Sequence, residues 1–420
     1  MRTQYFRGPV WGKTNDQLKK QIIEGNNPLT GKPVMQEIIS KLTSPLTAAE
    51  KDMSEKKRDM GPATYTDTEE NLHKLFIDKR YTDFLPVILP TKERVDAMLA
   101  QTSHDPDEIL ATMNPGSEAG ETWTYTVRHA AIAAVMAGAK PEYFPVILAI
   151  GSSGSTPLNV SDNGFMAGAV INGKIRDEIR LNYDIGAVGP YAQANTTIGR
   201  AWSLLALNGA NCGKVGTTYM GTVGNTANLV NVIIAENEEL SPWEPYAVRR
   251  GFRKDENVVT IFIGWGILSA KNWKVNAWSS NMNYPQIIKD IYQQQDSLFG
   301  TIAVLSPPIA EFVRDGGFDT VEKFTEWVTA PDMAGKPKPD PDMASKPKAK
   351  PGSGAEEEWV LLNPGVMMPK SNPKGGVAAS KPGMPMGSNF NVIVTGSTNN
   401  NYFMMGGMIP GRSIPIDAWR

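Results

Sequence analysis

Three glutamates and an asparagine follow directly after an apolar run that has the composition of a buried strand. The run covers residues 229–235 and is rich in β-branched side chains, and Glu236, Asn237, Glu238 and Glu239 come next. Such a short apolar run is typical of a strand whose two faces are both covered. Because ligands bind at the carboxyl ends of strands in open α/β sheets, these four residues form our candidate site.

Two of these carboxylates, Glu236 and Glu238, point to the same side of an extended chain, because side chains alternate along a strand. Carboxylates so close repel each other unless a cation, a shared proton or an arginine lies nearby. One interpretation is a general acid and base, or a pair of ligands for Mg²⁺ or Mn²⁺. The other is a structural ion-pair network with arginines that the sequence supplies at Arg176, Arg200, Arg249 and Arg250.

Other polar side chains are candidates for catalysis or for binding a small substrate. His129 is the one polar residue on an otherwise apolar helix face, where it is either a base or an ordinary core or surface histidine. Asparagines in loops are also candidates for binding a polar substrate, although turns and helix caps use the same residue type. The substrate-binding candidates are Asn172, Asn195, Arg200, Asn237 and Ser397.

The segment after the glutamates predicts a helix over residues 242–250. Ser241 and Glu244 have the spacing of a capping box, and Pro242 suits the first helical position. Two arginines in the last turn and then Gly251 are typical of a helix end.

A second apolar run at residues 258–263 completes a strand–helix–strand pattern. We predict that the runs at 229–235 and 258–263 are neighbouring strands of one sheet. The expected fold class is α/β, with a mixed or parallel sheet and helices on both faces. A helical N-terminal segment and an extended arm precede this core.

The chain divides by composition into five parts. Residues 1–60 form a polar N-terminal arm, and residues 61–150 form a helical segment. Residues 151–330 hold the α/β core, which residues 358–420 complete. Between them, residues 331–357 contain PDMAGKPKP and PDMASKPKA, an imperfect duplication too rich in proline and lysine to form a core, so we expect a flexible insertion.

Within these parts, further elements follow from local patterns. Residues 84–89 have the composition of a short strand, and residues 123–137 have the pattern of a helix that ends at Gly138. Asn195 is the expected cap of a helix at residues 196–207.

Composition narrows the class of protein. The 420 residues are 41% hydrophobic and 20% charged with a net charge of −2, so no bulk basic field is present to bind nucleic acid or an anionic membrane. A single cysteine, Cys212, excludes an intrachain disulfide. No apolar run reaches the roughly 18 residues of a membrane span, and the opening residues lack an apolar signal core. We therefore expect a cytoplasmic protein.

Several segments together resemble the bacterial UGSC family of (seleno)proteins. The resemblance covers roughly residues 65–420, and its most specific part is IAENEELSPWEP at residues 234–245. The motif that names the family, a selenocysteine or cysteine followed by Gly-Ser-Cys, is absent here, because Cys212 is followed by Gly213 and Lys214. This departure weakens the prediction of a thiol-redox function. The other segments are FLPVILPTKERVDAML at 84–99, AVMAGAKPEYFPVILA at 134–149, ANTTIGRA at 194–201, RRGF at 249–252 and VIVTGS at 392–397.

Two functions from different classes remain open. The first is a hydrolase or lyase that acts on a small polar or anionic molecule through carboxylate acid–base or metal-assisted chemistry. The second is a non-catalytic protein that assembles into a homo-oligomer, with the arm at residues 1–60 crossing to a partner. A thiol-redox role for Cys212 is a third alternative.

Overall fold

The computed structural model describes residues 13–47, 64–114, 123–158, 165–215, 218, 224–269, 283–294, 300–330, 390–398 and 401–420. The chain separates into two units, Met1–Thr66 and Asp67–Arg420. The expected insertion at residues 331–357 lies outside the described residues. None of the helices within the described ranges is both long and apolar enough to cross a membrane.

The first unit contains short helices and leaves apolar side chains in the open. Helices α1 (Asn15–Leu18) and η1 (Lys19–Ile23) precede α2 (Val34–Thr43), the longest described helix of this unit. Ile39 and Leu42 of α2 are 54% and 81% exposed. This unit therefore does not bury the apolar face of α2 by itself.

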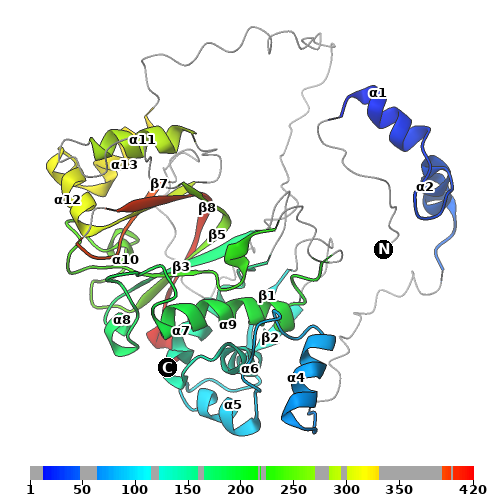
Figure 1. Cartoon of the computed structure of the whole chain (residues 1–420), viewed down its shortest axis with the longest axis horizontal. Helices are drawn as coiled ribbons and strands as arrows, with labels where there is room; N and C mark the ends of the chain where they lie inside the picture. The colour runs from blue at the N-terminus through cyan, green and yellow to red at the C-terminus, as the bar shows by residue number, and fades with distance from the viewer. Residues whose placement is uncertain are drawn as a thin grey trace. The chain divides into compact units, whose positions relative to one another are not determined.

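The second unit is built on a six-stranded mixed sheet in the order β4-β3-β5-β8-β6-β7 (Figure 1). The β3–β4 and β6–β7 pairs are parallel, and the other neighbouring pairs are antiparallel. The α/β class with a mixed sheet is thus confirmed. The strands are β3 (Met166–Asn172), β4 (Val232–Ala235), β5 (Val258–Ser269), β6 (Thr301–Leu305), β7 (Phe390–Val394) and β8 (Tyr402–Pro415).

The sheet consists of two halves with the same topology. In the first half, β3 pairs with β4 on one side in parallel and with β5 on the other side antiparallel. In the second half, β6 pairs in the same way with β7 and β8. The halves join along β5 and β8, so the strand order reads the same from either edge. Two copies of one unit related by a two-fold rotation produce this order.

The sheet bends so that the inner faces of its halves pack on each other. Val170, Ile234 and Phe262 of the first half share one buried cluster with Val304 and Ile393 of the second. This contact accounts for the uninterrupted apolar character of these strands, since their opposite faces are also covered.

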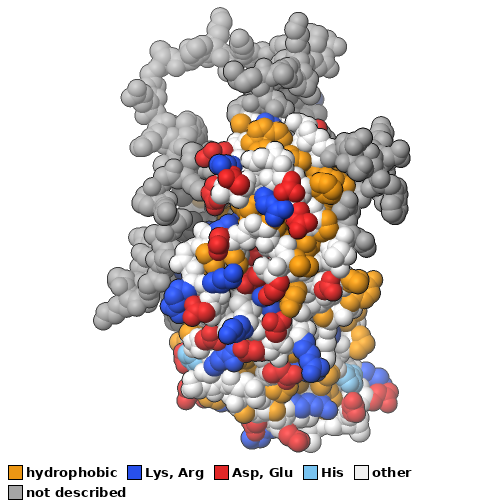
Figure 2. All heavy atoms as spheres, turned by 90° about the vertical axis from the view of Figure 1, so that its left-hand side faces the viewer, with side chains coloured by type: hydrophobic (Ala, Val, Ile, Leu, Met, Phe, Trp, Pro, Cys, Tyr) orange, Lys and Arg blue, Asp and Glu red, His pale blue; other side chains and the backbone are white. Residues whose placement is uncertain are grey.

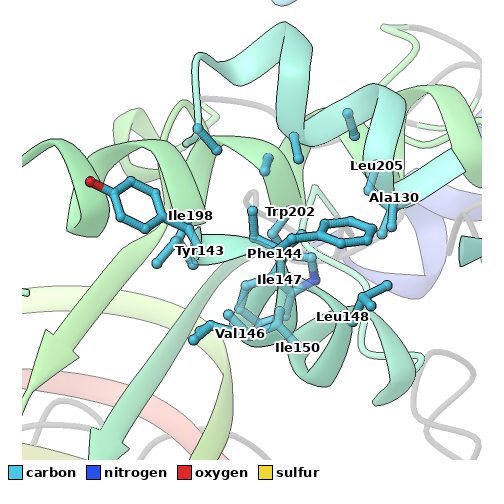
Figure 3. Close-up of a cluster of buried hydrophobic side chains, with 14 of the residues drawn as sticks. Ala130, Tyr143, Phe144, Val146, Ile147, Leu148, Ile150, Ile198, Trp202 and Leu205 are labelled. Carbon is cyan, nitrogen blue, oxygen red and sulfur yellow. The ribbon is translucent and has the colours of Figure 1, made fainter. Parts of the chain in front are cut away.

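Helices cover the outer face of each half. The first half packs against α6 (Val127–Ala137), α7 (Phe144–Ser152) and α9 (Gln193–Gly209), where Phe144 and Trp202 lie at the centre of the cluster in Figure 3. The second half packs against α11 (Tyr284–Gln294), α12 (Pro307–Asp315) and α13 (Val321–Thr329). Each group of helices therefore covers the outer face of its own half, while the inner faces of the two halves pack on each other.

Smaller elements complete the second unit. Strands β1 (Ile109–Met113) and β2 (Trp123–Thr126) form a separate antiparallel pair. The remaining helices are α4 (Glu69–Asp78), α5 (Lys92–Leu99), η2 (Pro141–Tyr143), α8 (Ile175–Glu178), η3 (Thr226–Asn228), α10 (Tyr246–Arg249) and η6 (Asp417–Trp419).

The prediction of a helix at residues 242–250 is wrong about where the helix starts and which residue caps it. Only α10 (Tyr246–Arg249) is helical, and Ser241 Oγ accepts from the nearby Trp243 N–H at 3.3 Å instead of capping a helix at Glu244. The reason lies in Pro245, because a proline disfavours the helical conformation of the residue before it.

The two runs predicted to be neighbouring strands are not neighbours. Strand β3 lies between β4 and β5, parallel to the first and antiparallel to the second. Strand β4 also begins later than predicted, at Val232, because Asn231 has a left-handed φ of 51°. A helical connection between two apolar runs does not reveal that an earlier strand has inserted between them.

Two further elements differ from their predictions. Residues 84–89 form no strand, since Phe84 has φ 68° and an exposed side chain. Within the predicted helix at 123–137, Trp123–Thr126 is strand β2, which pairs with Ile109–Met113. The helix begins only at Val127, because this distant partner stabilises an extended conformation for four aromatic and β-branched residues.

Candidate functional site

The carboxyl ends of two strands, one from each half of the sheet, meet at the candidate site. The backbone N–H of Asn237, just beyond β4, donates to the carbonyl oxygen of Val394 at the end of β7 at 2.8 Å. Oγ1 of Thr395, the first residue after β7, donates to the carbonyl oxygen of Ala235 at the end of β4 at 2.7 Å. The two halves therefore build this place together.

Glu236 is held at the centre of this junction. Its Oε2 accepts from Nδ2 of Asn172 and from the backbone N–H of Tyr246, both at 2.6 Å. Its Oε1 lies 3.8 Å from Nη2 of Arg249, and the residue is only 1% exposed. Strand β3 supplies Asn172, and α10 supplies Tyr246 and Arg249.

Glu238 is tied to the same asparagine and to a buried arginine. Its Oε1 accepts from Nδ2 of Asn172 at 3.0 Å and from the backbone N–H of Gly173 at 2.8 Å. Nε of Arg176 lies 3.4 Å from the same oxygen. Arg176 also pairs with Glu239, with Nη2 and Oε1 2.8 Å apart. These contacts form an ion-pair network of the kind that the sequence left open.

Burial sets the protonation of Glu236. Removal from water raises the pKa of the Glu236 carboxyl, and the nearby negative charge of Glu238 acts in the same direction. Arg249 and the hydrogen bonds from Asn172 and Tyr246 partly oppose this rise. Glu236 therefore keeps its proton to a higher pH than an exposed glutamate does, as a general acid requires.

We predicted a ligand cleft lined by Glu236, Asn237 and Glu238, but these side chains are enclosed. Glu236 and Asn237 are 1% and 3% exposed, and the side chain of Glu238 is 8% exposed. Their enclosure follows from the curl of the sheet, which brings the end of β7 against the end of β4.

The donors around these carboxylates do not fit a divalent cation. Glu236 and Glu238 each accept hydrogen bonds from two N–H groups, while Arg176 and Arg249 already supply positive charge. In the part of the chain that the structure describes, no group of three or more His, Cys, Asp or Glu side chains is placed to hold a metal ion. We therefore derive no step through the Mg²⁺ or Mn²⁺ that the sequence suggested.

Asn237 and Ser397, two of the predicted substrate-binding residues, both lie at the junction. Nδ2 of Asn237 donates to the carbonyl oxygen of Gly396 at 3.1 Å, and its Oδ1 accepts from the Leu240 N–H at 3.1 Å. Gly396 has φ 92°, a left-handed conformation that glycine adopts without strain. The half-buried Ser397 follows this turn directly.

Asn195 is a structural neighbour of the site and not the predicted helix cap. Helix α9 begins at Gln193, so Asn195 lies inside it. Its Nδ2 donates to the carbonyl oxygen of Ile233 in β4 at 3.1 Å, and its Oδ1 accepts from the Asn182 N–H at 2.8 Å. Asn195 thus joins α9 to the strand that carries the glutamates.

Two predicted site residues are engaged elsewhere. His129 Nδ1 accepts from the backbone N–H of Thr126 at 3.1 Å and completes a capping box at the start of α6. Arg200 pairs with Asp83, with Nη2 and Oδ1 2.8 Å apart, and donates to the carbonyl oxygen of Pro86. A helix cap accounts for the first side chain, and an ion pair with a residue distant in sequence accounts for the second.

The thiol of Cys212 is in a poor environment for redox chemistry. It is fully buried, and burial raises its pKa to about 12. Because the thiolate is the reactive form, this environment disfavours nucleophilic or redox use.

Two residues at the junction were not predicted from the sequence. Thr395 occupies the position after β7 that Glu236 occupies after β4, and only the repeated topology reveals the equivalence. Tyr246 contributes a backbone N–H, which no side-chain pattern can show.

The resemblance to the UGSC family stays a prediction. Comparisons of the chain with protein-family models, with curated proteins and with solved structures find no match.

Proposed function

We propose that this protein is an enzyme, a hydrolase or lyase, that acts on a small polar or anionic molecule at the junction of the two halves. One observation carries the proposal: a buried carboxyl with a raised pKa lies where the ends of β4 and β7 meet. Ligands of open α/β sheets bind outside the carboxyl ends of the strands, and a protonated carboxyl at such a place can serve as a general acid.

Each half contributes different chemistry to this proposal. Glu236 and Asn172 come from the first half, while Thr395 and Ser397 come from the second. Of these groups, the half-buried Ser397 hydroxyl suits a polar or anionic substrate, and the Glu236 carboxyl transfers the proton. The buried Oδ1 of Asn172 has no hydrogen-bond partner among the described residues and offers one further acceptor.

The decisive variant is Glu236→Gln, which keeps the shape of the side chain but cannot exchange a proton. Native mass spectrometry of the purified chain first identifies the small molecule that copurifies. With that molecule as substrate, we expect turnover to fall roughly 10²-fold or more while the fold persists. Glu244→Gln, on an exposed glutamate of the same segment, should leave turnover unchanged.

The same variant has a signature in the pH dependence of stability. Because its pKa is raised on folding, Glu236 binds more protons in the folded chain, so its contribution to stability falls as pH rises above about 4.5. Glu236→Gln cannot ionise and should lack this part of the decline in melting temperature. Lowered melting with unchanged turnover would mean that the carboxyl is only structural.

A second candidate function, homo-oligomer assembly, is favoured by the exposed apolar face of α2. Ile39 and Leu42 lie three residues apart on this helix, with Leu46 just beyond it, and all three are at least half exposed. Burying a leucine is worth about 1.5–3 kcal/mol, so such a face gains stability from a partner. We propose that the partner is a second copy of this chain.

Light scattering tests this assembly on the full chain. We expect a multiple of the 45.8 kDa protomer mass for the unmodified protein. The double variant Ile39→Asp and Leu42→Asp should weaken association by at least about tenfold, while Ser40→Asp on the same helix should not. A 45.8 kDa species at micromolar concentration in the unmodified protein would remove this function.

A further inference from the structure

An aromatic groove lies on the outer face of the second half, apart from the candidate site. It has a volume of about 380 Å³ and opens between α11, α12 and α13. Figure 2 shows the molecule from the side on which these helices lie in Figure 1, with hydrophobic side chains next to acidic ones. The groove is lined by Asn283, Pro285, Phe312, Gly316, Phe318 and Trp327.

The lining favours a ligand that contains proline and lysine. The rings of Phe318 and Trp327 pack with their centroids 5.1 Å apart, and Phe312 remains 42% exposed. Nζ of Lys289 lies 4.7 Å from the centre of the Trp327 ring, so this ring already accepts an ammonium group. Aromatic grooves of this kind bind proline-rich segments in the extended polyproline conformation.

The residues around the groove carry a net negative charge, and residues 331–350 carry a net positive charge. The described residues between 283 and 330 carry six acidic and three basic side chains. Residues 331–350 carry five lysines and three aspartates, together with five prolines. Their approach is therefore electrostatically favoured.

The last described residues before this segment lie next to the groove. Trp327 is in the last turn of α13, which ends at Thr329. Ala330 then has φ −62° and ψ 131°, close to the polyproline conformation, and Pro331 follows. A segment tethered so near its binding site has an effective concentration in the millimolar range, so modest intrinsic affinity suffices.

We propose that the aromatic groove binds residues 331–350 of the same chain. The duplicated motifs PDMAGKPKP and PDMASKPKA each provide prolines for the aromatic rings, lysines for the acidic side chains between residues 283 and 330, and a methionine. Methionine sulfur makes favourable contacts with aromatic rings, which suits Met333 or Met343. The duplication then offers the groove two alternative occupants.

A fluorescent label in the segment tests this binding in the full chain. Ser345→Cys is labelled with a bimane dye, which tryptophan quenches on contact. Cys212 should not react, because it is buried and its pKa is raised to about 12. We expect emission at position 345 to be lower by roughly half than that of the same dye attached through Ser371→Cys, outside the segment.

Variants of the groove separate this proposal from its alternatives. Phe312→Ala, on a part-exposed side chain, and Trp327→Phe, which removes the quencher with little change in shape, should each restore emission at position 345. Emission that is unquenched, or that neither variant changes, overturns the proposal. Quenching that disappears on dilution would show that the groove binds the segment of a second copy, which overturns binding within one chain.

Discussion

Replacing Arg176 with alanine will lower the free energy of unfolding by about 3–5 kcal/mol. The guanidinium is buried, lies 3.4 Å from Oε1 of Glu238 and pairs with Glu239 at 2.8 Å. It also donates to the carbonyl oxygens of Gly173 and Glu236. Its removal leaves a buried carboxylate without its cation and two carbonyl groups without a donor, and water cannot replace them in so enclosed a place.

Denaturant unfolding of Arg176→Ala against the unmodified chain measures this loss. Arg253→Ala is the matched control, because Arg253 pairs with Asp255 at 3.1 Å but its side chain is 73% exposed. An exposed pair contributes at most about 1 kcal/mol, so the control should be nearly neutral. If Arg176→Ala loses less than the control does, the buried network does not brace the junction.

The second large effect is expected at Gly264, where the two halves of the sheet meet. Gly264 of β5 pairs with Met408 of β8, next to a shift in the register of these strands. A Cβ at position 264 would overlap the carbonyl oxygen of Gly407, which is backbone and cannot turn away as a side chain can. Gly264→Ala should therefore cost about 3 kcal/mol, the upper end of the range for overpacking.

Gly168 supplies the control for this prediction. It lies in β3, in the same sheet, and a Cβ there would meet its neighbours at 3.5 Å or more, which is ordinary contact. Thermal unfolding should show a large drop for Gly264→Ala and a small change for Gly168→Ala. Equal drops in both variants would mean that neither reports on the close pairing of β5 with β8.

The sequence by itself determined elements whose stability is local. The helix predicted to end at Gly138 does end there, with Gly138 in a left-handed conformation at φ 79°, and strand β5 begins at Val258, where the predicted apolar run begins. The α/β class followed from apolar runs that alternate with helical segments. In each case the signal lies within a few residues of the element it specifies.

Part of the site could also be predicted from the local sequence pattern. Glu236 and Glu238 were selected because they follow a buried run, and their neighbours Asn172 and Arg176 were named as a binding candidate and a possible partner. Because strand ends collect polar groups in this fold class, the position alone carried that information.

Only the tertiary structure decided how these pieces meet. The insertion of β3 between β4 and β5, the strand at Trp123–Thr126 and the enclosure of Glu236 all depend on partners distant in sequence. Strand pairing is set by backbone hydrogen bonds, which are alike for every residue type, so local composition does not encode the order. For the same reason the equivalence of Thr395 with Glu236, and with it the shared junction of the two halves, appears only once the sheet is formed.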